Sequence, residues 1–424
     1  MNDTLISAIT DFTLAARDLL TREAGEQLEG IFGWLPDGTF GEAKRYPALA
    51  TLPEAAETRR RLELYTREET EAGVVPSVAR EKLKREAAFT WLNRAAAFRL
   101  LEERKLIKPT LARLHKSNGY VFWLTTDGNE ANLALHEQGT LPLNLMGEGP
   151  ADVAYRHWLL AQCEAQSAQV SVLFDPGTLA TRLCPRPAAL RQVVESMNAD
   201  ALAPAWHAGN EETVGWLYEG FIEDENAVVF EKFSKGKKVL PSEIGAATQR
   251  FTPRWIVEFL IQNSLGRLWL EMHPDSRLGR SMAYLVPVEG TGKRALKAVK
   301  EITFLDPSCG SMHFGLIAFD LFAEMYREER ERAGQPGWPK LSSVDTEDAI
   351  PGAILESNLH GIDIDLRAVQ VSALALLLRA KTLNPKTVAT DANLACANVE
   401  QLTGGQLEEF IKQTKFSHPI YERT

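Results

Sequence analysis

The sequence predicts an α/β protein in which a mainly α-helical N-terminal domain precedes the first part of a doubly wound, Rossmann-like parallel sheet. Up to about residue 225, apolar residues recur every three or four positions, which is the period of an α-helix. After about residue 240, short apolar runs of strand length alternate with helical patterns, which is typical of a parallel sheet joined by crossover helices. We therefore expect a helical domain over residues 1–240 and a partial α/β domain over residues 241–424.

The clearest helical pattern lies between residues 81 and 106. Leu83, Ala87 and Trp91 belong to an apolar stripe, whereas basic residues such as Arg94 are expected largely on other faces of the helix. One segment departs from the helical period, because residues 120–124 are rich in β-prone side chains and predict an isolated hairpin strand.

The α/β region contains three short apolar runs and two helical patterns in alternation. The runs at residues 302–305, 359–364 and 394–399 predict strands, and residues 312–333 and 366–383 predict the helices between them. This order of strand, helix, strand, helix and strand is the observation on which the fold class depends.

Composition restricts the class of protein. The chain has 424 residues, of which 45% are hydrophobic and 25% charged, which are ordinary values for a soluble globular protein. No run approaches the roughly 18 apolar residues of a membrane span, and the start Met1-Asn2-Asp3 lacks the basic region of a signal peptide, so a cytoplasmic protein without a membrane partner is expected. Four cysteines without a Cys-x-x-Cys pair predict free thiols and no metal site.

The net charge of -10 argues against nucleic-acid binding over the whole surface, although a local basic groove is compatible with it. One basic stretch, residues 232–238, has two interpretations. It contacts phosphate, or it is a solvated linker between the two domains, and the second interpretation is favoured.

The segment from Phe304 to Phe314 is the strongest candidate for a functional site. Asp306 ends a predicted strand and is followed by a turn of small residues, and this combination lets backbone approach a nucleoside-like ligand at the edge of a sheet. An ordinary strand-to-helix turn is the alternative, since such turns also favour Asp, Pro, Gly and Ser.

A second carboxylate ends the next predicted strand. Asp363 is placed to accept hydrogen bonds from ribose hydroxyls, whereas Asp365 is expected to cap the following helix. The two carboxylates are 57 positions apart, far more than the roughly 20 of a dinucleotide-binding unit, and residues 334–352 are interpreted as an insertion. Because Gly-x-Gly-x-x-Gly is also absent after the first strand, a nicotinamide dehydrogenase is not expected.

Together these residues resemble the adenine-specific DNA methyltransferases, and more narrowly the PglX-like enzymes of the BREX and DISARM phage-defence systems, which are similar to type II restriction-modification enzymes. The segment 306–311 is similar to their Asp-Pro-Ala-Cys-Gly-Ser cofactor loop, and 361–365 to their ribose-binding strand. The segment 247–257 resembles the one that covers the methionine end of the cofactor, and 88–94 and 215–219 resemble the helical region before the catalytic domain.

The resemblance implies S-adenosyl-L-methionine as the cofactor. It places Asp306 near the cofactor's amino group, Thr252 and Pro253 near its methionine end, Asp363 at its ribose and Asn398 at its adenine. The implied cofactor-binding residues are Phe251, Thr252, Pro253, Asp306, Ser308, Gly310, Ser311, Phe314, Asp363, Ile364 and Asn398.

Two departures from the family pattern affect the expected activity. Met312 stands where the family commonly has glycine, and its side chain would narrow the site unless the backbone keeps a negative φ. No Asn-Pro-Pro-Tyr, the family's catalytic segment, follows Asn398, and Asn384-Pro385 precedes the last strand and predicts the end of a helix. No catalytic residue is therefore assigned.

We expect the chain to be the cofactor-binding portion of the enzyme. A C-terminal half or a partner subunit would supply the catalytic motif and target recognition on double-stranded DNA. The alternatives are a non-catalytic module that binds cofactor or a partner within a defence complex, and a methyltransferase that acts on RNA or protein.

Several aromatic, basic and histidine side chains outside these motifs have structural interpretations. Trp255, Phe259 and Trp269 recur at near-helical spacing, which favours core packing over base stacking. Arg254 and Arg367 are expected to form salt bridges with nearby acids rather than contact phosphate. His313 lies within the candidate loop, and two interpretations remain open for it: packing or a solvent contact, and a catalytic role.

Overall fold

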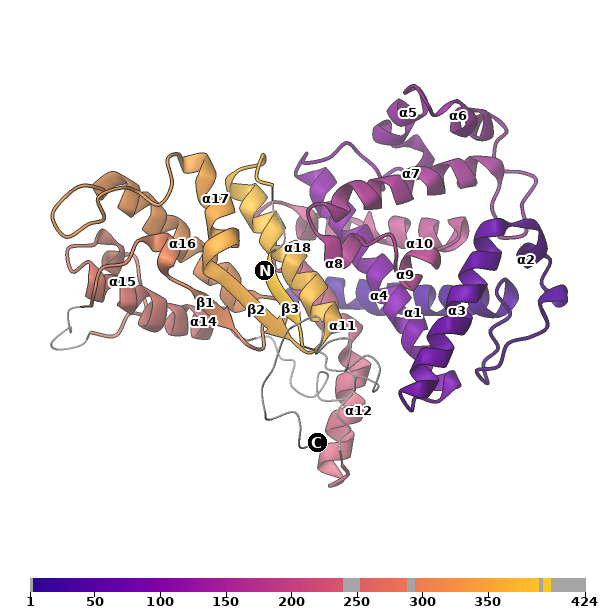
Figure 1. Ribbon diagram of the computed structural model, residues 1–424, viewed down its shortest axis with the longest axis horizontal. Helices are drawn as coiled ribbons and strands as arrows, with labels where there is room; N and C mark the ends of the chain where they lie inside the picture. Colours follow the sequence, from indigo (N-terminus) through magenta and orange to yellow (C-terminus); the bar gives the residue numbers. More distant parts are fainter. Residues whose placement is uncertain (1–2, 239–251, 288–293, 389–391, 398–424) are drawn as a thin grey trace, which may run out of the picture.

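The computed structural model describes residues 3–238, 252–287, 294–388 and 392–397. The described chain is elongated, with a helical part at one end and the sheet-containing part at the other (Figure 1). Helix α18 (Leu366–Leu383) joins the two parts, because it contacts strands of the sheet on one side and helices of the helical part on the other. No helix among the described residues has the length and apolar character needed to span a bilayer.

The helical part contains no regular strand among its described residues. Its helices are α1 (Asp3–Gly30), α2 (Pro47–Thr51), α3 (Pro53–Glu71), α4 (Pro76–Glu103), α5 (Asn118–Leu124), α6 (Glu130–Glu137), α7 (Pro150–Ser167), α8 (Ser171–Phe174), α9 (Leu179–Arg182), α10 (Pro187–Met197), α11 (Thr213–Phe221) and α12 (Glu223–Ser234). Proline occupies the start of α2, α3, α4, α7 and α10, where its fixed φ favours the helix and its missing N–H costs no hydrogen bond.

Helix α4 lies at the centre of this part. The predicted stripe of Leu83, Ala87 and Trp91 is buried, as expected. The expectation for Arg94 is wrong, because its side chain is also buried and donates hydrogen bonds to the carbonyl of Leu173 at 2.9 Å and to Oγ1 of Thr181 at 2.8 Å. These bonds replace part of the hydration that the guanidinium loses, which lets a charged residue enter the core.

The hairpin strand predicted at residues 120–124 is absent, and these residues lie in α5. Tyr120 and Leu124 are four positions apart and both buried, which is the spacing of one helix face. The ring of Tyr120 packs against that of Tyr155 in α7, with the ring centroids 5.2 Å apart. Packing against a neighbouring helix therefore overrides the weak β-propensity of this segment.

The sheet-containing part follows the predicted alternation. Its strands are β1 (Phe304–Asp306), β2 (Leu359–Asp363) and β3 (Asn393–Cys396), and its helices are α14 (Arg254–Ile261), α15 (Arg267–Met272), α16 (His313–Arg332), α17 (Ile350–Ala353) and α18. The strands are parallel in the order β1-β2-β3. The predicted strands and both predicted crossover helices are thus confirmed to within a few residues, as far as the described residues extend.

Helices α16 and α18 cover the same face of the sheet. Both contact β2 and each other, as right-handed crossovers between sequential parallel strands require. On that face Leu359 is buried, whereas on the other face Leu305 is 56% exposed and Ala395 is also exposed. The described residues therefore form a small parallel sheet with helices on one face, and the doubly wound arrangement with helices on both faces remains an expectation.

The predicted insertion at residues 334–352 packs against α15 and α16. Trp338 stacks on His273 with ring centroids 4.0 Å apart, and the amide of Ser343 donates to a carboxylate oxygen of Glu329 at 2.6 Å. The segment therefore contributes to the core of this part.

Of the three aromatic residues expected in the core, only Trp269 is buried, with 0% exposure. Trp255 is 57% exposed and Phe259 is 39% exposed, so core packing is the wrong interpretation for both. Val257 and Ile261 are the buried residues of α14. The helix turns this aliphatic face towards α16 and leaves the aromatic face outside.

Candidate cofactor-binding site

The two candidate carboxylates end adjacent parallel strands. The register pairs Asp306 of β1 with Gly361 of β2, so Asp363 lies two positions further along at the same edge of the sheet. Burial raises the pKa of Asp306, and the negative charge of Asp363 raises it further, although a hydrogen bond from Ser308 acts in the opposite direction. The two side chains are therefore close enough to interact electrostatically.

The carboxylate of Asp306 is only partly occupied. Its Oδ1 accepts a hydrogen bond from the backbone amide of Ser308 at 3.1 Å. Within the described ranges no donor contacts Oδ2. The side chain is half-buried, so one oxygen of a carboxylate with a raised pKa remains available to an external donor.

Asp363 has a different environment, because both of its oxygens bind backbone. Oδ2 accepts from the amide of Gly310 at 2.9 Å, and Oδ1 accepts from the amide of Asp365 at 2.8 Å. The carboxylate thus connects the turn after β1 to the turn after β2, and it is only 7% exposed. Sequence reasoning assigned it to a ribose alone and missed this structural role.

The turn after β1 is held tightly against β2. The amide of Cys309 donates to the carbonyl of Ile362 at 3.0 Å, and the hydroxyl of Ser372 in α18 donates to the carbonyl of Gly310 at 2.7 Å. Gly361 allows this approach, since a Cβ there would lie 2.7 Å from Cδ2 of Leu394 and 3.1 Å from Sγ of Cys309. Close packing between this turn and β2 therefore requires glycine at position 361.

The backbone of Met312 does not have the negative φ under which its side chain would not narrow the site. Its φ is +62°, in the left-handed region that non-glycine residues rarely adopt. Its side chain is fully buried, and a Cβ at Gly315 would collide with it, so the thioether packs into the core beside α16. Burial of the side chain compensates for the backbone conformation.

Thr252 lies next to the start of α16. The imidazole of His313 is hydrogen-bonded to the backbone of Thr252, and its Nε2 lies 3.9 Å from a carboxylate oxygen of Glu212. Burial lowers the pKa of His313, whereas the charge of Glu212 raises it. Arg254 bridges Glu258 at 2.8 Å and Glu212 at 3.3 Å, which confirms the expected salt bridging.

The remaining candidate residues surround this edge unequally. Ser308, Pro253 and Ile364 are exposed, whereas Gly310, Ser311, Phe314 and Thr252 are half-buried. Phe251 and Asn398 lie outside the described residues, as do residues 247–250 of the predicted segment 247–257. Strand β3 reaches the same edge, because the amide of Ala397 donates to the carbonyl of Asp363 at 2.8 Å.

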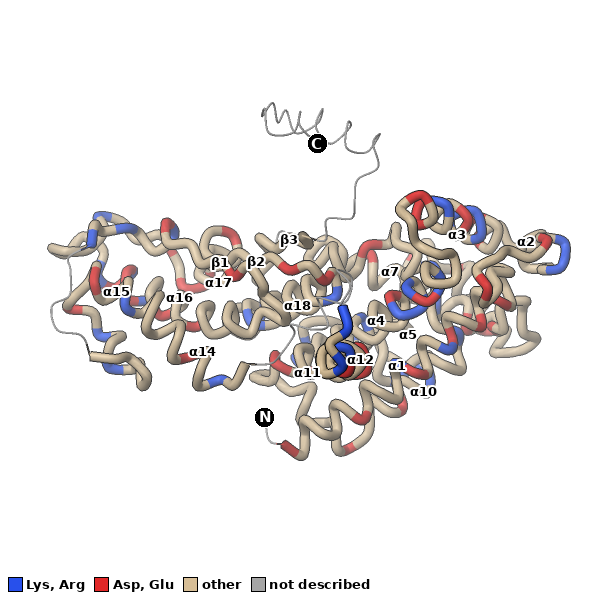
Figure 2. The backbone as a smooth tube through the Cα atoms, turned by 90° about the horizontal axis from the view of Figure 1, so that it is seen from below, with Lys and Arg blue, Asp and Glu red and all other residues tan. Residues whose placement is uncertain are grey.

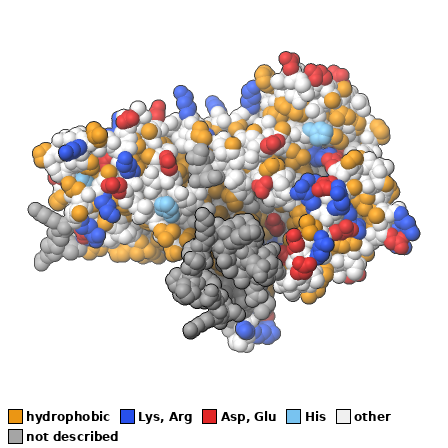
Figure 3. Space-filling model, in the orientation of Figure 1, with side chains coloured by type: hydrophobic (Ala, Val, Ile, Leu, Met, Phe, Trp, Pro, Cys, Tyr) orange, Lys and Arg blue, Asp and Glu red, His pale blue; other side chains and the backbone are white. Residues whose placement is uncertain are grey.

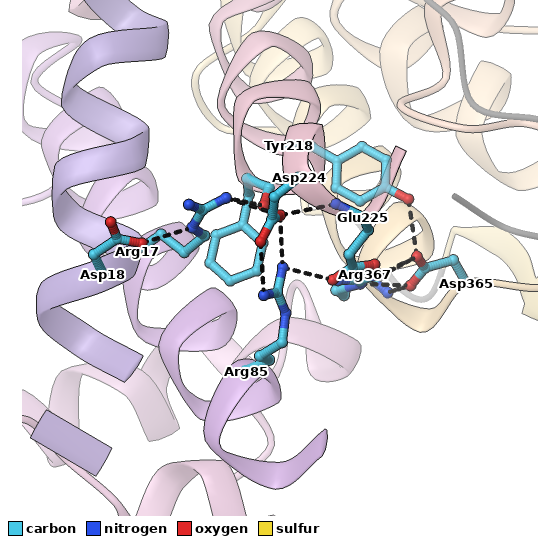
Figure 4. Close-up of polar contacts among 9 residues, drawn as sticks. Arg17, Asp18, Arg85, Tyr218, Asp224, Glu225, Asp365 and Arg367 are labelled. Atoms are coloured by element: carbon cyan, nitrogen blue, oxygen red, sulfur yellow. Dashed lines mark hydrogen bonds and ion pairs between the residues drawn. The ribbon is translucent and has the colours of Figure 1, made fainter. Parts of the chain in front are cut away.

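The structure adds contacts from the helical part that the motifs did not predict. The hydroxyl of Tyr218 in α11 donates to Oδ2 of Asp365 at 3.0 Å (Figure 4). Asp365 also caps α18, as expected, by accepting from the amide of Arg367 at 2.8 Å. The only sequence signal for Tyr218 was the resemblance of 215–219 to the family's helical region.

The fold and the site define an α/β protein with a pair of interacting carboxylates at the carboxyl edge of a parallel sheet. The chain is 31% identical over 386 residues to the adenine-specific methyltransferase BrxX of Escherichia coli O9:H4 (strain HS), which covers 86% of this chain and 29% of BrxX. It is 28% identical over 417 residues to the adenine-specific methyltransferase PglX of Lacticaseibacillus casei (strain Zhang), which covers 90% of this chain and 33% of PglX. The chain is therefore related by sequence to the PglX-like adenine-specific methyltransferases, as its motifs predict.

The matches span about a third or less of each relative's length. No family model matches the chain.

Proposed function

We propose that this chain holds S-adenosyl-L-methionine at the carboxyl edge of its sheet and is the cofactor-binding portion of an adenine-specific DNA methyltransferase of a bacterial restriction-modification or BREX-type defence system. The names of the two relatives support the reaction class. The observation that carries the cofactor assignment is that Asp306 and Asp363 end adjacent parallel strands and interact electrostatically. Ligands of open α/β sheets bind outside this edge.

The residues present fit such a cofactor. S-adenosyl-L-methionine carries an amino group and ribose hydroxyls as donors, and Oδ2 of Asp306, which accepts from no described residue, is a suitable acceptor. Asp363 keeps a second lone pair on each oxygen while its backbone bonds fix its orientation. When bound, the cofactor supplies the methyl group for transfer.

In this proposal the described residues bind and orient the cofactor and do not activate the adenine. Asp306 and the turn 308–311 would position the cofactor, Thr252 and Pro253 would lie at its methionine end, and Asp363 would face its ribose. Polarisation of the adenine amino group and base extrusion belong to the missing Asn-Pro-Pro-Tyr segment, which we place in a C-terminal region or partner subunit. Orientation of the two reactants then accounts for much of the rate enhancement.

Binding of double-stranded DNA is proposed mainly for that other region. Acidic and basic residues are intermixed along both described parts (Figure 2), and on the face in Figure 3 their side chains do not separate into areas of one sign. A chain of net charge -10 with this distribution has no extended basic surface in these views to follow a phosphate backbone.

A second candidate is a non-catalytic module that binds cofactor or a partner within a defence complex. The absence of Asn-Pro-Pro-Tyr from the sequence favours it for the chain acting alone. Methyl incorporation into adenine-containing duplexes, with and without the rest of the enzyme, separates the two. Incorporation into RNA or protein instead of DNA would assign the fold to another substrate.

Calorimetric titration with S-adenosyl-L-methionine tests the cofactor site. Asp306→Asn is expected to weaken binding by about 10- to 100-fold, because a charge-assisted hydrogen bond becomes a weaker neutral one. Asp363→Asn is expected to weaken binding at least as much. The carboxylate of Asp363 accepts from the amides of Gly310 and Asp365, so its replacement also disturbs the two turns. Asp127→Asn, at an exposed carboxylate of the helical part, is the matched control and should leave the dissociation constant unchanged.

Loss of affinity in both site variants with an unchanged control supports the site. Absence of binding by the parent chain, or equal affinity in the parent and both site variants, would contradict it.

A further inference from the structure

The turn after β2 is contacted by the helical part as well as by the sheet. Tyr218, which lies 147 positions before Asp365, donates its phenolic hydrogen to Oδ2 of Asp365 at 3.0 Å. Its side chain is buried, and burial together with the charge of Asp365 raises the pKa of Tyr218 well above its usual range. The phenol therefore stays neutral and remains a donor at all physiological pH values.

A second connection runs through Arg367, at the start of α18. Its guanidinium binds both oxygens of Glu225 at 2.9 Å each, and it also bridges Asp365 at 2.8 Å. Bidentate pairs of this kind fix direction as well as distance. Glu225 belongs to α12 of the helical part, so Arg367 is held from outside its own helix.

The network continues into two more helices. Arg85 of α4 binds Glu225 at 2.8 Å and both oxygens of Asp224, and Arg17 of α1 binds Asp224 at 2.9 Å (Figure 4). Three arginines thus share two adjacent carboxylates at the start of α12. The shared geometry restricts the position of Glu225 and, through it, of Arg367.

This network reaches the candidate cofactor carboxylate in one further step. The backbone amide of Asp365 donates to Oδ1 of Asp363 at 2.8 Å. The side chain of Asp365 is bound by Tyr218 and Arg367, and both contacts restrict the turn that carries this amide. The orientation of Asp363 therefore depends on contacts made by α11 and α12.

We propose that Tyr218 and Glu225 of the helical part are positioning residues for the cofactor site, acting through Asp365 and Arg367 to hold the turn that carries Asp363. The inference rests on the proposed function and deepens it, because it makes the helical part a determinant of cofactor affinity. A carboxylate that is already oriented binds its ligand without the cost of being ordered.

The test compares affinity with stability in the whole chain. Tyr218→Phe removes one hydroxyl and is expected to weaken S-adenosyl-L-methionine binding by about three- to tenfold in calorimetric titration, and Glu225→Gln by a similar factor. Tyr155→Phe is the matched control, because the hydroxyl of Tyr155 is a buried donor to the carbonyl of Thr110 at 2.8 Å, away from the turn. It should lower the melting temperature without changing the dissociation constant.

A double-mutant cycle separates positioning from a general loss of stability. If Tyr218 acts through Asp365, the Tyr218→Phe change should have no further effect on affinity in an Asp365→Ala background, which lacks the acceptor. Hydrogen exchange at the amides of Asp365 and Arg367 should become faster in Tyr218→Phe and stay unchanged in Tyr155→Phe.

The inference is overturned if Tyr218→Phe and Glu225→Gln bind the cofactor as tightly as the parent chain does while Asp306→Asn loses affinity. Equal effects of Tyr218→Phe in the parent and Asp365→Ala backgrounds would also overturn it. If the parent chain itself fails to bind, the proposed function has failed, and that result is distinct from the other two.

Discussion

Asp306 and Asp363 are chemically identical side chains in the same edge of the sheet, and the structure gives them different surroundings. Asp363 accepts two backbone amides, whereas Asp306 accepts one and faces the negative charge of its neighbour. Backbone donors stabilise an ionised carboxylate, and burial and a like charge destabilise it. Asp306 is therefore the residue at which the folded state is under electrostatic strain, which is common where a ligand later supplies the missing partner.

This strain predicts how stability depends on pH. Because the pKa of Asp306 is raised on folding, the folded chain binds this proton more tightly than the unfolded chain does. Ionised Asp306 lowers the free energy of unfolding. This effect is absent below the pKa of an unfolded aspartate, about 3.9, grows as pH rises through the raised pKa of the folded state, and persists at neutral pH. Asp306→Asn should therefore have a higher urea midpoint than the parent chain at pH 7, with the difference closing near pH 3.5.

The exposed substitution Asp127→Asn is the control for a general effect of charge removal. A midpoint for Asp306→Asn at or below that of the parent chain at pH 7 would show that the ionised carboxylate is not under strain.

At the scale of elements, α14 and α15 show how one helical period leads to opposite burial. Val257 and Ile261 bury one face of α14 against α16, which leaves Trp255 and Phe259 on the outer face. Trp269 in α15 points into the core, and its indole N–H donates to a carboxylate oxygen of Glu328 at 2.9 Å. All three aromatic residues recur at near-helical spacing, and the position of the neighbouring helix distinguishes the two exposed rings from Trp269.

The difference in burial predicts different costs of truncation. Trp269→Ala should lower the free energy of unfolding by about 3–5 kcal/mol, because it leaves a cavity and removes one of the hydrogen-bond donors to the buried Glu328 carboxylate. Trp255→Ala should change it by no more than about 0.5 kcal/mol, as expected for an exposed side chain. Urea unfolding followed by far-ultraviolet circular dichroism measures both without depending on tryptophan emission. Comparable losses in the two variants would contradict the assignment of faces.

At the scale of the whole molecule, α18 and the charged network at its start join the two parts of the chain. Helix α18 packs on β2 and β3 and also on α4, α8 and α11. Arg367 connects it to Glu225 with two bonds of 2.9 Å, and its side chain is only 21% exposed. We therefore expect the two parts to unfold together.

Arg367→Ala tests this coupling. Its removal leaves Glu225 and Asp365 without their shared cation, and we expect the free energy of unfolding to fall by about 2–4 kcal/mol. Arg60→Ala, at an exposed pair with Glu57, should cost no more than about 0.5 kcal/mol. In Arg367→Ala, unfolding should also separate into two transitions, so that the midpoints from circular dichroism and from differential scanning calorimetry no longer coincide. A single transition with an unchanged midpoint would show that the network does not couple the parts.

The local order of elements was predictable from the sequence because it depends on neighbouring residues. The boundaries of α18 coincide with the predicted helix at 366–383, and β1 and β2 fall within two residues of the predicted strands. The prediction failed at residues 120–124, where a helix forms through packing with Tyr155. Short segments have weak intrinsic preferences, and their neighbours in space decide between them.

The sequence by itself determined the strand–turn–helix units, the two carboxylates at strand ends and the resemblance to adenine-specific methyltransferases. The assignment of individual residues to the cofactor stays a prediction. Only the tertiary structure decided that Asp363 binds the turn of Gly310, that Met312 adopts a left-handed conformation, and that Tyr218 reaches Asp365. These features join residues far apart in the chain, so they depend on how elements pack, which no local pattern of residues records.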